Sequence, residues 1–166
     1  MSILRADTIA TVAGVEQARL VQVQTVNKTD RFTTTSSSFV DVTDFSVEIT
    51  PTHADNKILV FVSTQIGNAN DSGYPCECQL VRDSTAIALG TSSSAGGHNY
   101  TAFSINSNGY ESQSICPVFL DDAQSTSAHT YKFQIKAGGG TAALGGRGDD
   151  ATYSNHSTIT VMEIRS

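Results

Sequence analysis

The stretch FTTTSSSFVDVTDFSVEITPTHADNKILVFVSTQI, residues 32–66, decides the fold that the sequence predicts. Apolar and polar residues alternate from Val40 to Val42 and again from Phe45 to Ile49. Such a period of two is typical of a strand with one buried face. The apolar positions change from even to odd at Thr43-Asp44, so we expect a bulge or a tight bend there. We interpret this point as a corner where the strand crosses between two sheets.

The second half of this stretch is apolar at every position from Ile58 to Val62. Pro51 ends the preceding strand, because proline has no N–H to donate to a neighbouring strand. A continuous apolar run predicts a strand that is buried on both faces. One-sided strands next to a two-sided strand predict two packed layers.

Strand-like segments continue along the chain, separated by turns rich in Gly, Asn, Asp and Ser. The clearest is His129–Ala137, where aromatic and aliphatic residues occupy every second position. Pro117 interrupts the segment Glu111–Leu120, which indicates an edge or a bulge. No window keeps a 3.6-residue period, so we predict an all-β fold, an antiparallel β-sandwich or jelly roll of about 8–10 strands. The other expected strands are Arg19–Val26, Pro75–Arg82, Thr85–Leu89, Tyr100–Ile105, Thr141–Leu144 and Ser157–Ile164.

The composition fits one domain and argues against several classes of function. The 166 residues carry a net charge of −6, and only 16% of them are charged, whereas Ser and Thr number 20 each. Scattered Lys and Arg on an acidic body argue against nucleic-acid binding, which needs clustered basic groups. No stretch reaches the ~18 apolar residues of a membrane span. The N-terminus has no basic region followed by an apolar core, so we expect no signal peptide and synthesis in the cytoplasm.

The first 18 residues differ from the rest, because their apolar residues follow neither a helical nor a strand period. We expect residues 1–18 to be an extended assembly arm that docks on a neighbouring subunit or another partner, and residues 19–166 to form the β-domain. Packing of the arm on its own domain is the alternative. In Arg19–Val26, Val alternates with Gln, and an uncharged Gln face is compatible with close packing around a symmetry axis. The apolar arm residues are Ile3, Leu4, Ile9 and Val12.

The residue types that usually carry chemistry form no catalytic or metal-binding pattern. Cys76 and Cys78 lie two apart and are expected to be small core residues, while Cys116 makes the count odd and argues against a disulfide framework. The four His are spread along the chain without HExxH or HxH spacing, and no G-x-S-x-G motif occurs. Carboxylate pairs in loops leave only a weak Ca²⁺ site open. We therefore expect no enzyme, no cofactor and no metal.

Two features are candidates for ligand or receptor binding. Arg147-Gly148-Asp149 spells the tripeptide that integrins bind, although a Gly-rich turn contains these residues in any case. Tyr74, Tyr100 and Tyr110 lie in or beside expected loops, and sugar rings pack on aromatic faces; the alternative is that each is an ordinary loop or core aromatic. We expect the loops at the ends of the domain, at residues 67–74, 90–99, 106–110 and 145–150.

Several segments resemble proteins of tailed phages. MSILRADTIA (residues 1–10) resembles the N-terminal segments by which tail-fibre and other appendage proteins attach to a virion. Small phage proteins, notably of phages that infect cyanobacteria and other aquatic bacteria, are similar in five further segments. These are VQTV (23–26), FTTTSSSFVDVTDFSVEITP (32–51), KILV (57–60), LVRD (80–83) and the ending ATY (151–153) with STITVMEI (157–164).

This resemblance covers most of the chain and implies a virion structural protein. The expected role is a homotrimeric tail-fibre or fibre-tip subunit, a jelly roll similar in outline to the C1q and tumour-necrosis-factor fold. It would contact other virion proteins and a host-surface glycan, without inserting into a membrane. The chain lacks a long shaft repeat, which leaves a capsid decoration protein without a receptor role as the alternative. An enzyme that degrades host polysaccharide is the third reading.

Overall fold

The computed structural model describes residues 19–69, 73–93, 98–105 and 111–165. These residues form twelve strands and contain no helix, so the prediction of an all-β fold is confirmed. The strands are β1 (Arg19–Lys28), β2 (Phe32–Thr34), β3 (Val40–Ile49), β4 (Lys57–Asn68), β5 (Pro75–Arg82), β6 (Thr85–Ile87), β7 (Ala102–Ile105), β8 (Ser112–Ile115), β9 (Val118–Asp121), β10 (His129–Ala137), β11 (Ala142–Leu144) and β12 (Ser157–Arg165).

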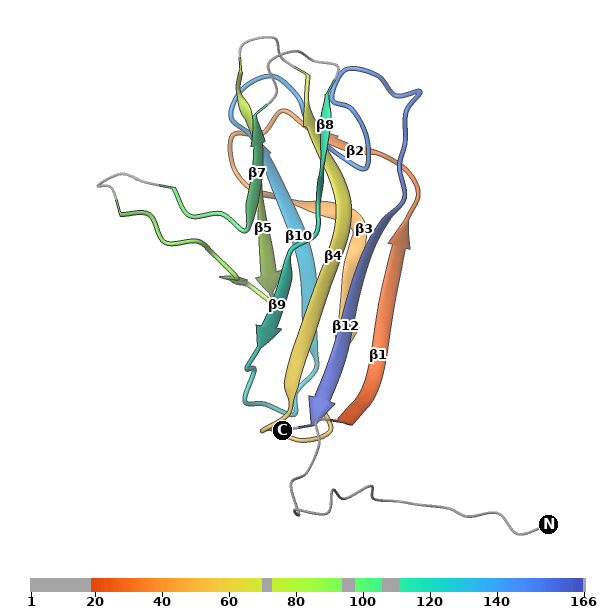
Figure 1. Cartoon of the computed structure of the whole chain (residues 1–166), viewed down its shortest axis with the longest axis vertical. Helices are drawn as coiled ribbons and strands as arrows, with labels where there is room; N and C mark the ends of the chain where they lie inside the picture. Colours follow the sequence, from red (N-terminus) through yellow and green to blue (C-terminus); the bar gives the residue numbers. More distant parts are fainter. Residues whose placement is uncertain (1–18, 70–72, 94–97, 106–110, 166) are drawn as a thin grey trace, which may run out of the picture.

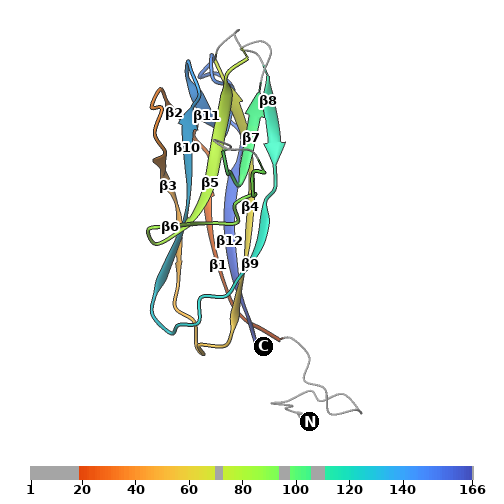
Figure 2. The same ribbon diagram turned by 90° about the vertical axis from the view of Figure 1, so that its left-hand side faces the viewer.

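Two antiparallel sheets pack face to face as a β-sandwich (Figures 1 and 2). The larger sheet has the order β1-β12-β4-β11-β2, and β8 and β9 also pair with β4. The smaller sheet has the order β3-β10-β5-β6, and β7 also pairs with β5. The long strand β4 therefore lies at the centre of the larger sheet and β10 lies inside the smaller one.

The core lies between the sheets and is formed by alternate residues of their strands. In β10 the odd-numbered side chains from Tyr131 to Ala137 are buried and the even-numbered ones are half-buried, as the alternation predicts. Cys76 and Cys78 are fully buried on the inner side of β5, in agreement with their expected role as small core residues. Phe45 of β3 packs edge-on against Phe133 of β10, with ring centroids 6.5 Å apart.

The change of phase at Thr43-Asp44 is a bulge, as expected, but it is not a crossing between sheets. Asp44 has a φ of 56°, in the left-handed region. On both sides of the bulge β3 pairs with the same neighbour, β10, with a register shift at Phe133. The extra residues let Val42 and Phe45, which stand at an even and an odd position, both point into the core.

The expectation that Ile58–Val62 is buried on both faces is wrong for the described chain. Ile58, Val60 and Val62 are buried in the core, whereas Leu59 is only half-buried and Phe61 is 37% exposed. The pattern is the usual strand alternation, with apolar residues on both faces of β4. No described element of this chain packs over the outer face, so its apolar residues need another explanation.

The break at Pro117 agrees with its prediction. It separates β8 from β9, and these two short strands pair with successive parts of the same edge of β4. Across the gap, the carbonyl of Pro117 accepts a hydrogen bond from the N–H of Val62 (3.1 Å). Proline lacks a donor, so it is tolerated at this break in the edge.

Candidate functional site

The outward side of the larger sheet carries a continuous set of apolar side chains from four strands. Cross-strand neighbours form rows, because strand register aligns side chains on the same face. One row is apolar throughout: Val23 of β1, Met162 of β12, Leu59 of β4 and Leu120 of β9. We call the whole set the outer apolar face; its members are Leu20, Val23, Leu59, Phe61, Val118, Leu120, Met162 and Ile164.

Two further rows flank the apolar one. One row consists of Thr25, Thr160, Phe61 and Val118, listed in the order of the strands β1, β12, β4 and β9. The hydroxyls of the two threonines are 2.9 Å apart. The other row, on the opposite side of the apolar one, consists of Leu20 of β1, Ile164 of β12 and Lys57 of β4.

The outer apolar face is open to solvent within the described part of the chain. Val118 is 56% exposed, Leu120 55% and Val23 43%. Four strands about 4.8 Å apart and five residues at about 3.4 Å per residue cover roughly 330 Å² of sheet. Single exposed apolar residues are normal, but a contiguous patch of this size commonly marks an interaction surface.

In β1, Val23 lies outward and Gln22 lies inward, the reverse of the interface suggested by an uncharged Gln face, whereas Val26 packs against the core. Gln22 turns to the inner side and donates hydrogen bonds to Glu163 (2.6 Å) and to the carbonyl of Thr50 (2.8 Å). Val23 lies on the outer face instead. The apolar side of β1 therefore joins the exposed surface.

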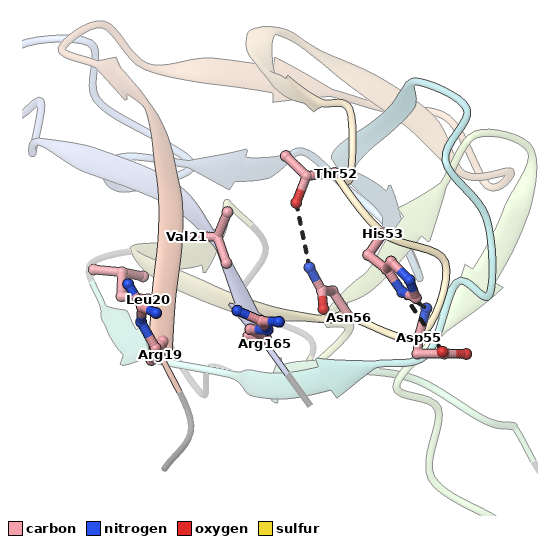
Figure 3. A pocket seen from close by; sticks show the side chains of 8 residues that line it. All are labelled: Arg19, Leu20, Val21, Thr52, His53, Asp55, Asn56 and Arg165. Atoms are coloured by element: carbon pink, nitrogen blue, oxygen red, sulfur yellow. Dashed lines mark hydrogen bonds and ion pairs between the residues drawn. The ribbon is translucent and has the colours of Figure 1, made fainter. Parts of the chain in front are cut away.

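A hollow of about 510 Å³ lies where β1 begins and β12 ends (Figure 3). The start of β1, the end of β12 and the turn after Pro51 contribute its walls. Thr52 and Asn56 are hydrogen-bonded to each other, and His53 lies 3.5 Å from Asp55. The lining residues are Arg19, Leu20, Val21, Thr52, His53, Asp55, Asn56 and Arg165.

Beside this hollow, the buried carboxylate of Glu163 ties the turn to both strands. It accepts hydrogen bonds from the side chain of Asn56 (2.6 Å), from the N–H and hydroxyl of Thr52 (both 2.7 Å) and from Gln22. Burial acts to raise the pKa of Glu163, but these hydrogen bonds outweigh it and lower the pKa to about 2. Sequence reasoning missed this network, because its members lie 107 to 141 positions away from Glu163 in the sequence and meet only in the folded chain.

Tyr100, a predicted ligand contact, lies in an aromatic cluster over the smaller sheet. His98 stacks on its ring at 5.7 Å, and the ammonium of Lys136 lies 5.3 Å from its centroid. Lys136 also pairs with the buried carboxylate of Glu77 at 2.5 Å. Burial, together with the nearby carboxylate of Glu77, raises the pKa of Tyr100. The Tyr100 ring therefore already has two partners, while neighbouring Phe103 is 56% exposed.

The other described candidates for ligand binding lie in separate surroundings. Arg147 and Asp149 pair with each other at 2.7 Å, and Arg147 lies over the ring of Tyr153. Between them, Gly148 packs directly on backbone: a Cβ there would lie 2.2 Å from the N of Ala69. Tyr74 is 44% exposed. A receptor role for these residues stays a prediction.

Part of the predicted site falls outside the described residues. Tyr110 and the arm residues Ile3, Leu4, Ile9 and Val12 are in this group. Among the expected loops, residues 67–68 belong to β4. The described parts of 90–99 project from the side of the sandwich and not from its end (Figure 1).

The described ranges hold neither a metal-binding cluster nor a membrane-spanning helix. They contain no group of three or more His, Cys, Asp or Glu placed to hold a metal ion. They also contain no helix of the length and apolar character that would cross a membrane.

Cys116 is exposed, and its Sγ lies 3.8 Å from the hydroxyl of Ser63.

In comparisons with known proteins, no family model matches this chain and neither does any curated protein. Solved structures with a similar outline come from infectious bursal disease virus. The Gx strain structure has 14% identity and a TM-score of 0.44, covering 98% of this chain and 42% of that chain. The T13 viral particle structure has 14% identity and a TM-score of 0.46, and it covers 98% of this chain and 39% of that chain. The VP2 subviral particle has 13% identity and a TM-score of 0.42, and it covers 98% of this chain and 41% of that chain. This chain thus spans about two fifths of the length of those chains. At these values the likeness carries no conclusion about function.

Proposed function

We propose that this chain is a structural subunit of a phage virion, a homotrimeric tail-fibre or fibre-tip protein. Residues 1–18 dock it to the particle, and loops of the β-domain contact a glycan of the host surface. The observation that carries the proposal is the outer apolar face, a surface of about 330 Å² by strand spacing that no described part of the chain covers. A protein that works by assembly needs such a surface, and the sequence resemblance to phage virion proteins gives the kind of assembly.

The docking role of the N-terminal arm is tested by removing residues 1–15 from the protein made during phage growth. We expect the shortened chain to fold but to be missing from purified particles, because the segment that attaches it is gone. Western blotting of the particles and circular dichroism of the purified chain measure the two properties. Incorporation of the shortened chain at the normal level would contradict the docking role.

A capsid decoration protein without a receptor role is the second candidate, because an apolar assembly face serves a capsid lattice as well as a fibre. The two candidates differ in where the protein lies. Gold labelling of an epitope-tagged chain on intact virions, viewed by electron microscopy, assigns it to tail or head. The third reading, an enzyme that degrades host polysaccharide, is tested by incubating the purified protein with host envelope. Release of sugar from the envelope would support that reading.

A further inference from the structure

We propose that the outer apolar face packs against the same face of further copies of this chain. The inference rests on the proposed function, in which the chain acts as an oligomeric subunit, and it names the partner of this surface. Three properties of the face favour another copy over the chain's own arm or a charged partner.

The first property is that the outer apolar face carries almost no charge. In the three rows of the face the only charged side chain is Lys57, and it pairs with Asp122 at 2.5 Å. The whole chain carries a net charge of −6, so most surfaces of two copies would repel each other. Copies that meet on this face bring only this Lys57–Asp122 pair, which has no net charge. A neutral apolar partner is therefore favoured, and the face itself is such a partner.

The second property is its width. The face spans β1, β12, β4 and β9, and a single extended segment is only about 4.8 Å wide, one strand spacing. An arm of 18 residues that lay across the face as one extended segment would match the width of one strand out of four. The sheet faces of other copies extend over all four strands, as sheets do in sheet-on-sheet packing.

The third property is the arrangement of an apolar centre with a polar edge. A stable interface buries about 800 Å² on each partner, with an apolar core and a polar rim. The outer apolar face supplies roughly two fifths of that area by strand spacing. The hydroxyls of Thr25, Thr160, Thr158 and Ser63 border it on the outward side of the same strands and provide the rim.

The test compares the mass of full-length variants in solution. Val118→Glu with Leu120→Glu places two carboxylates on the exposed edge of the face without disturbing the core. The matched control, Ser46→Glu with Thr85→Glu, makes the same charge change at exposed strand positions of the other sheet. Sedimentation equilibrium from about 1 to 100 µM covers the range of ordinary affinities, and circular dichroism verifies folding. We expect the wild type and the control to have a multiple of 17.5 kDa. The face variant should associate at least about 100-fold more weakly.

Each outcome decides the inference. A folded face variant with unchanged association overturns it, and so does a wild type of 17.5 kDa at 100 µM. If the β9 variant does not fold, Leu20→Glu with Val23→Glu on the edge strand β1 tests the same face. The particle incorporation of the full-length wild type is measured separately, so a failed interface and a failed virion role can be told apart.

Discussion

At the scale of single residues, Glu163 shows how a buried charge is held without an ion pair as its main support. Four hydrogen bonds from Gln22, Thr52 and Asn56 satisfy the carboxylate. They connect β1, β12 and the turn after Pro51, the three elements that surround the hollow at this end of the sandwich. A buried carboxylate that accepts several hydrogen bonds favours its ionised form, which explains its low pKa.

This network makes stability depend on pH. The pKa of Glu163 is about 2 in the folded chain against 4.5 for the ordinary group. The folded value is the lower one, so the stabilisation is complete above pH 4.5 and is lost as pH falls from there towards 2. The difference corresponds to about 3 kcal/mol. Glu163→Gln should lower the free energy of unfolding at pH 7 by about 2–4 kcal/mol, because an amide N–H₂ then faces donors.

Urea unfolding at a fixed protein concentration measures both effects. The variant should lose less stability than the wild type between pH 5 and pH 2.5, since this carboxyl no longer takes up a proton. Glu48→Gln is the control, at an exposed position of β3, and should change the free energy by no more than about 0.5 kcal/mol. Equal pH profiles for the wild type and Glu163→Gln would contradict the assignment.

At the scale of elements, the bulge in β3 reconciles two runs of opposite phase. Without it, either Val42 or the residues from Phe45 to Ile49 would face solvent, because successive side chains alternate between faces. The left-handed conformation of Asp44 produces the change of phase along β3. Asp tolerates this conformation better than most residues other than Gly and Asn.

Substitution of Asp44 tests the role of that conformation. Asp44→Val should destabilise the protein by about 1–3 kcal/mol, because a β-branched side chain is strained at positive φ. Asp44→Gly should change stability by less than about 1 kcal/mol, since the loss of strain offsets the greater freedom of the unfolded chain. Thr43→Val, at the exposed neighbouring position, separates a general effect of Val from the conformational one. Thermal unfolding measures all three, and equal losses for the two Val variants would sink the idea.

At the scale of the whole molecule, the apolar run of β4 gains its meaning from what surrounds it. Its inward residues fill the core, and its outward residues join those of β1, β9 and β12. The sequence predicts that this strand is buried on both faces, but in the described chain the smaller sheet covers only its inner face. Other copies of the chain would cover the outer one.

An apolar interface of this kind has a clear thermodynamic signature. The melting temperature should rise with protein concentration, because association stabilises only the folded state. It should change little between about 0.05 and 0.5 M NaCl, since screening affects charged contacts, and it should rise in sulfate, which strengthens apolar burial. Differential scanning calorimetry across a 50-fold range of concentration measures this, with Val118→Glu/Leu120→Glu as the insensitive control. A strong loss of melting temperature in NaCl would point to a charged interface.

The sequence alone determined the all-β class, the limits of most strands, the bulge at Thr43-Asp44 and the break at Pro117. These features depend on local alternation and on the geometry of single residues such as proline, so they can be read along the chain. The same rule misjudged Ile58–Val62, because periodicity reports that both faces of a strand are apolar but not what covers them.

Only the tertiary structure decided which residues meet. Leu59, Leu120, Val23 and Met162 come from four separate strands, and strand register alone places them in one row. Register depends on pairings between distant parts of the chain, as do the partners of Glu163. The stretch 32–66 thus predicted the sandwich, while the exposed face that makes this protein a candidate for assembly appeared only when its strands were paired.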